Sequence, residues 1–350
     1  MTPETPPSPP PPRRVLIIKP SALGDVVTAL PVLRGLRRTF PEAHVSWLLS
    51  TACAALLEGD RQLDEIIHFE RRRLGRAWRS PAAGKRLGEF LLGLRRGGFD
   101  WVIDLQGLFR SGFFALATGA PVRAGFRSAR ELAWTFYTRR YRPDRPHTVD
   151  RNVGLARALG IDARREDMVL EVPPAGREFA EAFRRKLGAG RSDFLAFVPP
   201  TRWQTKCYPA RHWRTVTAAL SRRLPIALLG TQADRALCAA VASAAGRGAV
   251  NLAGRTTIPQ MVGLIAEAAC VVCSDSAAQH IAQAVGTDVL TLIGPTRPER
   301  TGPLIRGRAL TAPVPCQGCL RRRCRHITCM ASIAPGMVVS AVEEMLANRK

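Results

Sequence analysis

The regular alternation of short apolar runs with amphipathic segments is the feature of this sequence that most constrains its fold. Short apolar runs bounded by turn residues are typical of strands that are buried on both faces of a sheet. Strands that alternate with helical segments predict parallel βαβ units, in which helices cover both faces of the sheet. The predicted strands are 15–19, 45–49, 65–69 and 101–105, followed by 194–198, 226–229, 249–252, 270–274 and 289–293.

A Pro/Gly-containing interruption, LEVPPAG at 170–176, divides this alternation into two series. A chain of 350 residues is long enough for two cores. We therefore predict an α/β protein with two doubly wound, Rossmann-like domains. Ligands of such sheets bind beyond the carboxyl ends of the strands, so we expect the site in a cleft there. The predicted segments are a Pro-rich tail (1–14), a first domain (15–170), a second domain (171–334) and a C-terminal helix (335–350).

The formal net charge of +24 limits the possible partners of the protein. A surplus of this size favours polyanions, namely nucleic acid, an anionic membrane surface or phosphorylated substrates. A compositional preference for arginine is an alternative explanation that stays open. No apolar run approaches the ~20 residues of a membrane helix, and residues 1–14 lack the apolar stretch of a signal peptide. We therefore expect a cytoplasmic protein.

The first candidate site is the segment KPSALGD at 19–25, directly after the first predicted strand. We expect Gly24 to make a tight turn and Asp25 to begin the following helix, predicted over 26–38. A carboxylate at that position either caps the helix by accepting backbone N–H bonds or faces the cleft as a catalytic group. The segment is not a dinucleotide fingerprint, because G-x-G-x-x-G is absent.

Two further candidate sites follow strands of the second domain. The segment PPTRWQTKCYP at 199–209 carries Arg202 and Lys206, whose cations suit a phosphate group at a strand's carboxyl end. They are otherwise solvated residues of an exposed loop. The segment CSDSAAQHIA at 273–282 leads into a helix whose free N–H groups and dipole form an anion site. With IGPT at 293–296 it describes a nucleotide diphosphate pocket, the alternative being that Asp275 and Ser276 only cap the helix.

Together with DLQGLFRS at 104–111, these motifs resemble glycosyltransferase family 9, the lipopolysaccharide heptosyltransferases. The matching segments follow one another in order from about residue 15 to the C-terminus. The resemblance implies the GT-B architecture, in which an acceptor-binding and a nucleotide-sugar-binding Rossmann-like domain face a central cleft. It also implies an inverting, metal-independent transfer from ADP-L-glycero-β-D-manno-heptose to the Kdo/heptose inner core carried by lipid A.

The resemblance assigns roles to individual residues. Asp25 matches the general base and Lys206 the lysine on the donor diphosphate. Thr256 corresponds to the base pocket and Asp234 to an acidic position near the ribose. The residues assigned to donor binding are Ser21, Gly24, Thr201, Arg202, Asp234, Thr256, Asp275, Ser276 and His280, and those assigned to acceptor binding are Arg73, Gln106 and Arg110.

These roles define a mechanism without a cofactor. Asp25 takes the proton of the attacking sugar hydroxyl, while Lys206 and the helix N-terminus at Ser276 stabilise the negative charge of the leaving ADP. The sequence contains no Asp-x-Asp motif, so we expect no metal on the diphosphate. One position departs from the family, since Ala277 stands where glycine is usual and its Cβ could crowd the phosphate.

Four of the nine cysteines, Cys316, Cys319, Cys324 and Cys329, form a cluster with His326 among them. Their spacing fits a structural zinc site, and unligated thiols or a redox-dependent bridge are the alternatives. Cys270 and Cys273 lie in an apolar run, where we expect reduced, buried thiols.

The basic residues are concentrated between residues 71 and 96, and the acceptor of the proposed family is an anionic lipid at the cytoplasmic leaflet. We therefore expect peripheral contact with the inner membrane, although a solvated basic helix would have the same sequence. The residues in question are Arg71, Arg72, Arg73, Arg76, Arg79, Lys85, Arg86, Arg95 and Arg96.

Other functions fit the sequence less well. A nucleic-acid-binding protein would account for the charge, but no recognised motif is present and aromatic residues make up only 6%, too few for stacking platforms. A dinucleotide-dependent oxidoreductase would need the missing glycine fingerprint. A family 9-like transferase that uses another nucleotide sugar, or a non-catalytic sugar-nucleotide binder, stays open.

Overall fold

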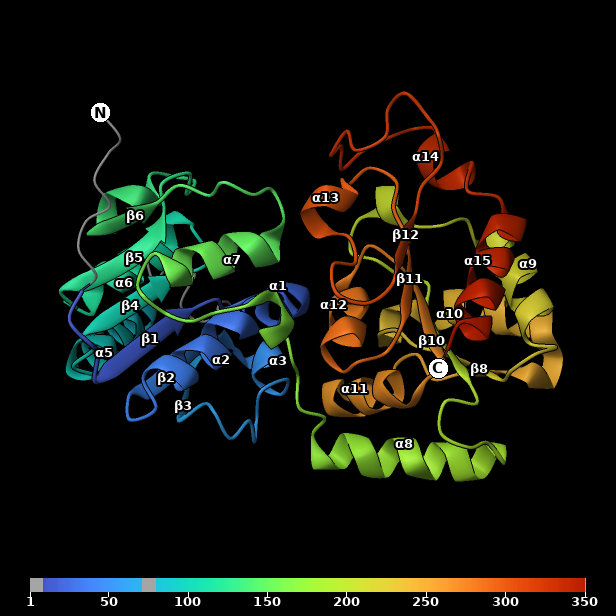
Figure 1. The fold of residues 1–350 in the computed structure, drawn as a ribbon, viewed down its shortest axis with the longest axis horizontal. Coiled ribbons are helices and arrows are strands. Elements are labelled where there is room, and N and C mark those ends of the chain that lie inside the picture. The colour runs from blue at the N-terminus through green and yellow to red at the C-terminus, as the bar shows by residue number, and fades with distance from the viewer. Residues whose placement is uncertain (1–8, 71–79, 350) are drawn as a thin grey trace. The chain divides into compact units, whose positions relative to one another are not determined.

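The computed structural model describes residues 9–70 and 80–349. The chain divides into two compact units, the first ending at Met168 and the second beginning at Val169. Each unit contains one six-stranded sheet in which every strand pair is parallel (Figure 1). The prediction of two doubly wound parallel sheets is therefore confirmed.

The elements of the first unit are β1 (Arg14–Ile18), α1 (Leu23–Val27), α2 (Leu30–Thr39), β2 (His44–Ser50), α3 (Thr51–Ala54), β3 (Glu65–Phe69), α5 (Pro81–Arg96), β4 (Trp101–Asp104), α6 (Phe109–Ala117), β5 (Val122–Phe126), η2 (Ala133–Phe136), β6 (Arg139–Tyr141), α7 (Thr148–Arg157) and η3 (Arg165–Asp167).

The elements of the second unit are α8 (Pro174–Leu187), β7 (Leu195–Val198), η4 (Gln204–Lys206), α9 (Ala210–Leu220), β8 (Ile226–Leu228), η5 (Gln232–Asp234), α10 (Arg235–Ala242), η6 (Ser243–Gly248), β9 (Ala249–Asn251), α11 (Ile258–Glu267), β10 (Cys270–Ser274), α12 (Ala277–Ala284), β11 (Val289–Leu292), α13 (Pro298–Thr301), β12 (Arg308–Leu310), α14 (Thr328–Ala331) and α15 (Pro335–Ala347).

Both sheets have the same strand order, which decides where a ligand can bind. The first sheet runs β3-β2-β1-β4-β5-β6, and the second, read from the other edge, runs β9-β8-β7-β10-β11-β12. In each unit the chain moves outward from the first strand in one direction and then returns to begin the other half beside it. The topological switch point therefore lies between β1 and β4 in the first unit and between β7 and β10 in the second.

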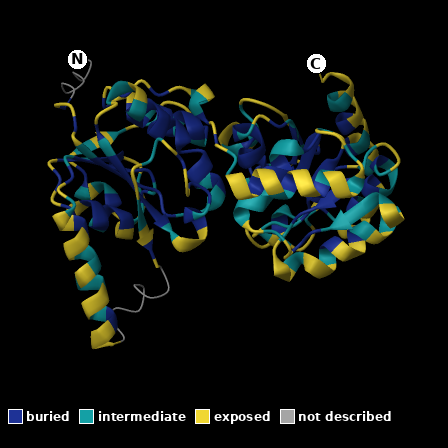
Figure 2. Ribbon diagram, turned by 90° about the horizontal axis from the view of Figure 1, so that it is seen from below, coloured by how far each residue is buried: buried dark blue, intermediate teal, exposed yellow. Residues whose placement is uncertain are grey.

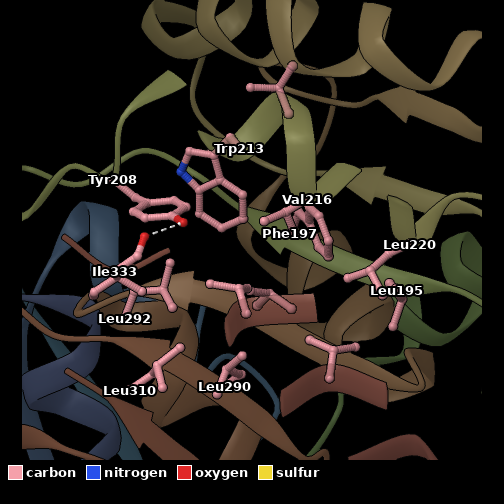
Figure 3. Close-up of a cluster of buried hydrophobic side chains, with 14 of the residues drawn as sticks. Leu195, Phe197, Tyr208, Trp213, Val216, Leu220, Leu290, Leu292, Leu310 and Ile333 are labelled. Atoms are coloured by element: carbon pink, nitrogen blue, oxygen red, sulfur yellow. Dashed lines mark hydrogen bonds between the residues drawn. The ribbon is translucent and has the colours of Figure 1, made fainter. Parts of the chain in front are cut away.

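The inner strands form the cores. All residues of β4, β7, β10 and β11 are buried, and Figure 2 shows the strands mostly in dark blue beneath helices with exposed outer faces. In the second unit, Phe197, Tyr208 and Trp213 pack against one another and against the leucines of the sheet (Figure 3). Burying each of the larger apolar side chains contributes about 1.5–3 kcal/mol.

The second unit begins with a close helix contact. An added Cβ on Gly263 of α11 would lie 2.0 Å from the carbonyl oxygen of Gly176 in α8, and one on Gly176 would lie 2.3 Å from the carbonyl oxygen of Pro259. Glycine at both positions lets the two backbones touch. At the other end of the unit, Val338, Ala341 and Val342 of α15 join the core beside α9.

The single helix predicted over 26–38 is wrong, because the segment forms two helices, α1 and α2. Pro31 lies in the first turn of α2, where its missing N–H leaves no hydrogen bond unmade. Between the helices, the hydroxyl of Thr28 donates to the carbonyl oxygen of Asp25 at 3.0 Å. The break keeps Asp25 in a short first helix beside the end of β1.

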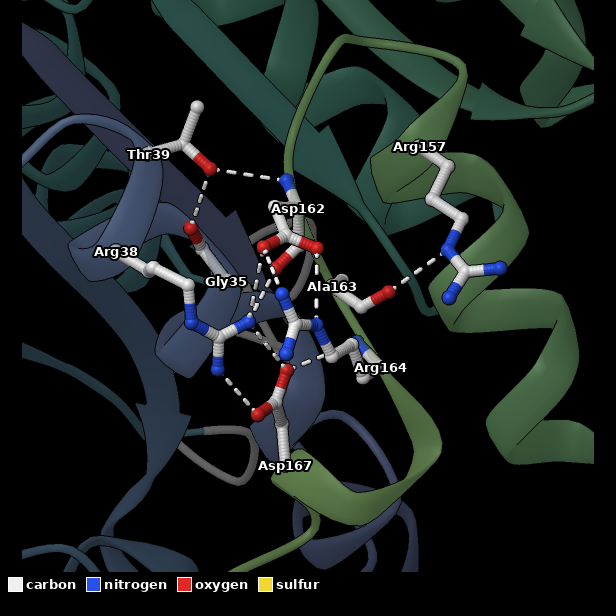
Figure 4. A network of polar contacts seen from close by, with 8 residues as sticks. All are labelled: Gly35, Arg38, Thr39, Arg157, Asp162, Ala163, Arg164 and Asp167. Atoms are coloured by element: carbon white, nitrogen blue, oxygen red, sulfur yellow. Dashed lines mark hydrogen bonds and ion pairs between the residues drawn. The ribbon is translucent and has the colours of Figure 1, made fainter.

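A polar network fixes the C-terminal end of the first unit to α2 (Figure 4). Arg38 donates to the carbonyl oxygen of Asp162 at 2.6 Å and pairs with the Asp167 carboxylate. The backbone N–H of Asp162 donates to the hydroxyl of Thr39 at 2.9 Å. Deeper in the unit, Arg34 of α2 makes a bidentate pair with Asp60, with N–O distances of 2.7 and 2.5 Å, and both side chains are at least nine-tenths buried.

We expect Asp60→Asn to lower the free energy of unfolding by roughly 3–5 kcal/mol, because it removes the carboxylate charge that faces the buried Arg34 guanidinium. Urea denaturation of the purified variant measures this. The matched control is Glu181→Gln, which breaks an exposed pair with Arg185 on α8 and should cost at most about 0.5 kcal/mol. Equal small losses in both variants would contradict the buried-pair interpretation.

Candidate functional site

In the second unit, an ion pair bridges the topological switch point. Lys206 lies in the loop after β7, and Asp275 directly follows β10. The Lys206 Nζ lies 2.8 Å from the Asp275 Oδ2, and the exposed fractions of the two side chains are 16% and 6%. The structure therefore brings together two residues of the predicted donor site that are far apart in the sequence.

The Asp275 carboxylate is held in its charged form. Burial by itself would raise the pKa of Asp275, but the Lys206 ammonium outweighs this effect, so that the pKa lies below its usual value. The other oxygen, Oδ1, accepts a hydrogen bond from the Gln279 side chain at 2.5 Å, and Thr301 donates to Oδ2 at 3.3 Å. The carboxylate is thus oriented from two sides as well as paired.

The N-terminus of α12 begins beside this pair. Ser276 is the N-cap residue, and its side chain makes no capping hydrogen bond to the helix. The first backbone N–H groups of α12 therefore keep their capacity to donate, and the helix dipole favours an anion there. Ala277 is the first helical residue, and His280 is buried in the first turn. The predicted strand–turn–helix arrangement of 273–282 is confirmed.

The loop that carries Lys206 is fastened to the core. The Tyr208 hydroxyl donates to the carbonyl oxygen of Ile333 at 2.8 Å, and the ring is buried. Within the loop, the Thr201 hydroxyl donates to the carbonyl oxygen of Trp203 at 2.7 Å, and the Lys206 N–H donates to the same oxygen at 2.9 Å. Arg202, in contrast, is exposed.

Two other predicted donor residues follow neighbouring strands at the same edge of the sheet. Asp234 follows β8, and its Oδ2 accepts bonds from the backbone N–H and the hydroxyl of Thr231 at 2.8 and 2.6 Å. Thr256 follows β9, is half-buried, and precedes the N-cap residue of α11. The Oδ2 of Asp234 therefore stabilises the turn after β8, and its Oδ1 remains available to another partner.

The first unit shows a similar arrangement at its own switch point. Lys19 follows β1, is buried, and donates from Nζ to the carbonyl oxygen of Leu105 beyond β4 at 2.9 Å. The same Nζ lies 3.9 Å from the Asp25 Oδ1. The Asp25 side chain is 45% exposed, so an accessible carboxylate lies beside a buried cation.

Asp25 is the third residue of α1, and its Oδ2 accepts the N–H of Ala22, the N-cap residue, at 3.0 Å. Asp25 therefore begins the helix as expected and caps it through this bond. The expectation that Gly24 makes the turn is wrong, since Gly24 is helical and buried in α1. The turn precedes it, and Ser21 lies there, half-buried.

The segment 104–111 is organised by Asp104, which is fully buried at the end of β4. Its Oδ1 accepts the N–H groups of Gln106 and Gly107 at 2.8 and 3.1 Å, and its Oδ2 accepts the Tyr137 hydroxyl at 2.6 Å. Burial raises the pKa of Asp104, and burial next to this carboxyl raises that of Tyr137. Asp104 thus shapes the loop that presents Gln106.

The predicted acceptor residues have different environments. Gln106 is half-buried, and its side-chain oxygen is enclosed with no hydrogen-bond partner among the described residues. Arg110 is exposed at the start of α6, with its guanidinium carbon 5.8 Å from the centre of the Phe69 ring. Arg73 lies outside the described residues, as do Arg71, Arg72, Arg76 and Arg79.

All nine cysteines lie within the described ranges, and each is a free thiol. Cys270 and Cys273 are buried in β10 as predicted, and burial raises the pKa of each to about 12. Cys316, Cys319, Cys324 and Cys329 line one cavity with His326. Among the residues that the structure describes, no three His, Cys, Asp or Glu side chains are arranged to hold a metal ion.

Sequence reasoning missed several residues that shape these sites. Lys19 was visible only as a lysine at the end of an apolar run, and Gln279 lies one helical turn after Asp275. Thr301 follows the IGPT segment. Gln279 and Lys19 are close in sequence to their carboxylates, but the spacing alone does not distinguish them from solvated residues, and the Thr301 contact joins segments 26 positions apart.

Comparisons with known proteins agree on one family. The model of "Glycosyltransferase family 9 (heptosyltransferase)" matches residues 88–329. "Lipopolysaccharide heptosyltransferase 1" of Pseudomonas aeruginosa is 30% identical over 329 residues, which cover 89% of this chain and 88% of that protein.

Solved structures share the fold. A glycosyl transferase family 9 structure from Veillonella parvula superimposes with a TM-score of 0.79 at 19% identity, covering 96% of this chain and 98% of that one. The Escherichia coli heptosyltransferase WaaC with ADP gives a TM-score of 0.75 at 24% identity, covering 95% of this chain and 99% of that one.

We expect Lys206→Met to lower the free energy of unfolding by roughly 3 kcal/mol at pH 7.5, because it leaves Asp275 buried without its cation. In the wild type the pKa of Asp275 is lowered, so the contribution of the pair is lost only as the pH falls below about 4. In the variant, burial without the cation raises that pKa. The destabilisation should therefore shrink between pH 7.5 and pH 5.

Urea denaturation at both pH values measures this difference, with the exposed Lys186→Met on α8 as the matched control. A loss of stability that does not change with pH would contradict the pairing of Lys206 with Asp275.

Proposed function

Because the chain belongs to glycosyltransferase family 9, we propose that it transfers heptose from ADP-heptose to the Kdo/heptose inner core of lipopolysaccharide, with inversion and without a metal. The protein is a heptosyltransferase of lipopolysaccharide core synthesis, like the relatives that it resembles. Its two parallel six-stranded sheets with flanking helices are those of the GT-B fold. The donor, the stereochemistry and the metal independence are the further steps of the proposal.

The observation that carries the proposal is the pairing of Lys206 with Asp275 beside the uncapped N-terminus of α12. A cation and a row of backbone N–H groups at a switch point are suited to a diphosphate. When the sugar–phosphate bond breaks, negative charge develops on the leaving nucleotide, and these groups stabilise it. They supply the positive charge that a divalent metal supplies in other transferases.

The buried polar atoms around Asp275 support a ligand at this place. The hydroxyl of Ser274 and the side-chain oxygen of Gln279 are enclosed, and neither has a hydrogen-bond partner in the described part of the chain. Buried groups of this kind are normally satisfied by protein, water or ligand. We assign Asp234 and Thr256, after β8 and β9 at the same edge, to the ribose and the base.

Asp25 is the proposed general base. One oxygen binds the N–H of Ala22, which fixes the carboxylate, and the side chain remains 45% exposed for an acceptor hydroxyl. The Lys19 Nζ, 3.9 Å from Oδ1, places a positive charge beside this carboxylate. The proposal requires this carboxylate and the diphosphate site of the second unit to act on one donor–acceptor pair.

We expect Asp25→Asn to reduce kcat by about 10²–10⁴-fold, which is the usual contribution of a general base. Asparagine keeps an oxygen for the Ala22 N–H, so α1 should persist and donor affinity should change little. A coupled assay of ADP release measures kcat and KM, and the control is Glu178→Gln, an exposed carboxylate of α8. Turnover of Asp25→Asn close to the wild-type value, with saturating donor, would remove Asp25 from this role.

A second part of the proposal is peripheral contact with an anionic membrane through the first unit. Lys85, Arg86, Arg95 and Arg96 of α5 are all exposed. Phe109 and Leu116 of α6 are exposed apolar residues, with 50% and 42% of their surfaces accessible. No helix in residues 9–70 or 80–349 is long and apolar enough to span a bilayer. Each cation near an anionic surface contributes about 1 kcal/mol.

We expect replacement of those four α5 cations by glutamine to weaken binding to anionic vesicles by at least about 100-fold at 0.1 M salt. Co-sedimentation with phosphatidylglycerol-containing vesicles measures this, and wild-type binding should fall as salt rises. The matched control replaces four exposed arginines of the second unit, Arg211, Arg214, Arg222 and Arg247. Binding that is insensitive to salt, or an equal loss in the control, would contradict the assignment.

A further inference from the structure

Trp203, which the proposed function does not use, lies against two cations of the second unit. The Lys206 Nζ is 4.6 Å from the centre of the indole ring, and the guanidinium carbon of Arg322 is 4.5 Å from it. Both distances are within the range of cation–π attraction, which is strongest on the face of tryptophan. One aromatic ring therefore connects the lysine at the switch point to an arginine more than 100 residues later.

The ammonium of Lys206 is consequently held in two different ways. Asp275 holds it through charge at 2.8 Å, and Trp203 holds it through the indole ring. An arriving diphosphate competes with the Asp275 carboxylate for the same cation, because both are anions. The indole carries no formal charge and is not exchanged for the diphosphate, so its contact with Lys206 can persist while the salt bridge is exchanged.

The indole itself belongs to a fixed turn. The carbonyl oxygen of Trp203 accepts the Thr201 hydroxyl at 2.7 Å and the N–H of Lys206 at 2.9 Å. The backbone of the turn is therefore set, and the remaining freedom is that of the Trp203 side chain. That side chain is half-buried, with Lys206 and Arg322 as its cationic neighbours.

Arg322 comes from the cysteine-rich segment, which we define as residues 316–329. This segment packs on the same turn, since a cavity is lined by its cysteines, by Thr205 and by Pro295. Arg322 is exposed. The cysteine-rich segment thus reaches the lysine loop both at this cavity and through the ring of Trp203.

We propose that Trp203 and Arg322 are positioning residues for Lys206. The Trp203 indole fixes the Lys206 ammonium at the mouth of the sheet, and Arg322 holds the indole in the orientation that does so. This inference rests on the proposed function, because Lys206 is assigned to the donor diphosphate there. According to this inference, the cysteine-rich segment affects donor affinity through the contact of Arg322 with Trp203, without touching the donor.

A different role for Arg322 makes a different prediction. If its charge attracted the anionic nucleotide directly, removing it would weaken binding whether or not Trp203 was present. If it acts through the ring, its removal has no effect once the ring is gone. A double-mutant cycle separates these two roles, because only coupled residues give non-additive losses.

The experiment measures the affinity of the full chain for ADP by titration calorimetry. We expect Arg322→Gln to weaken ADP binding by about 2- to 5-fold, and Trp203→Leu by up to about 30-fold, the range that cation–π contacts span from exposed to desolvated sites. The double variant Trp203→Leu/Arg322→Gln should bind within about twofold of Trp203→Leu, because Arg322 then has no ring to hold.

Two further comparisons test the path through Lys206. In the Lys206→Met background, Trp203→Leu should cost no further ADP affinity, whereas a general structural role would still cost affinity there. Trp203→Phe and Arg322→Lys should restore part of the loss, since each retains a ring or a cation. The control is Arg323→Gln, the next exposed arginine of the cysteine-rich segment, which should bind ADP like the wild type.

The possible results separate the positioning roles of Trp203 and Arg322 from the proposed donor site. An equal loss from Arg322→Gln with and without Trp203, or unchanged ADP affinity in Trp203→Leu, overturns the positioning roles. Failure of the wild type to bind ADP would instead refute the proposed donor. Circular dichroism checks that the variants fold, and if Trp203→Leu does not, Trp203→Met, which also lacks a ring, completes the same cycle with Arg322→Gln.

Discussion

The ion pair between Lys206 and Asp275 is the interaction on which the second unit's candidate site depends. Two loops that follow adjacent parallel strands, β7 and β10, each contribute one charge, and each charge is mostly shielded from water. Each charge stabilises the other, since an isolated buried charge is very costly. The pair therefore fixes both loops and keeps a lysine available at the point where a doubly wound sheet binds its ligand.

The first unit also has a buried lysine at its switch point, but the neighbouring carboxylate is more exposed than Asp275. Lys19 crosses from the loop after β1 to the carbonyl oxygen of Leu105 beyond β4, so that a buried cation again spans the switch point. Its carboxylate neighbour, Asp25, remains 45% exposed. One switch point thus holds a shielded cation–carboxylate pair suited to a diphosphate, and the other holds an accessible carboxylate suited to accepting a proton.

The inner strands could be predicted from the sequence because they are buried on both faces and read as continuous apolar runs. β10 is entirely buried and begins and ends at the predicted residues, as does β3, an edge strand whose sequence EIIHF still carries an apolar pair. β5, β6 and β12 were missed, since their sequences, VRAGF, RRY and RAL, carry charged or small residues and the latter two are largely half-buried or exposed. β6 and β12 are edge strands, and β5 lies between β4 and β6, but none of the three sequences contains a continuous apolar run.

The candidate site could be predicted only as a set of loops. The motifs placed Asp25, Lys206 and Asp275 at strand ends, because the alternation of strands and helices determines where turns fall. The partners of these residues depend on register and on which strands become neighbours. Lys206 and Asp275 are 69 positions apart, and Trp203 and Arg322 are further apart still. No local pattern encodes contacts between such distant segments.

The central claim is that protein charges alone allow heptose transfer from ADP-heptose with inversion. The most direct measurement incubates the full chain with ADP-heptose and a Kdo-bearing lipid A acceptor in the presence of EDTA, and determines the anomeric configuration of the product by NMR. We predict a heptosylated product whose anomeric configuration is opposite to that of the donor. A product that forms only with an added divalent metal, or that retains the donor configuration, would contradict the account.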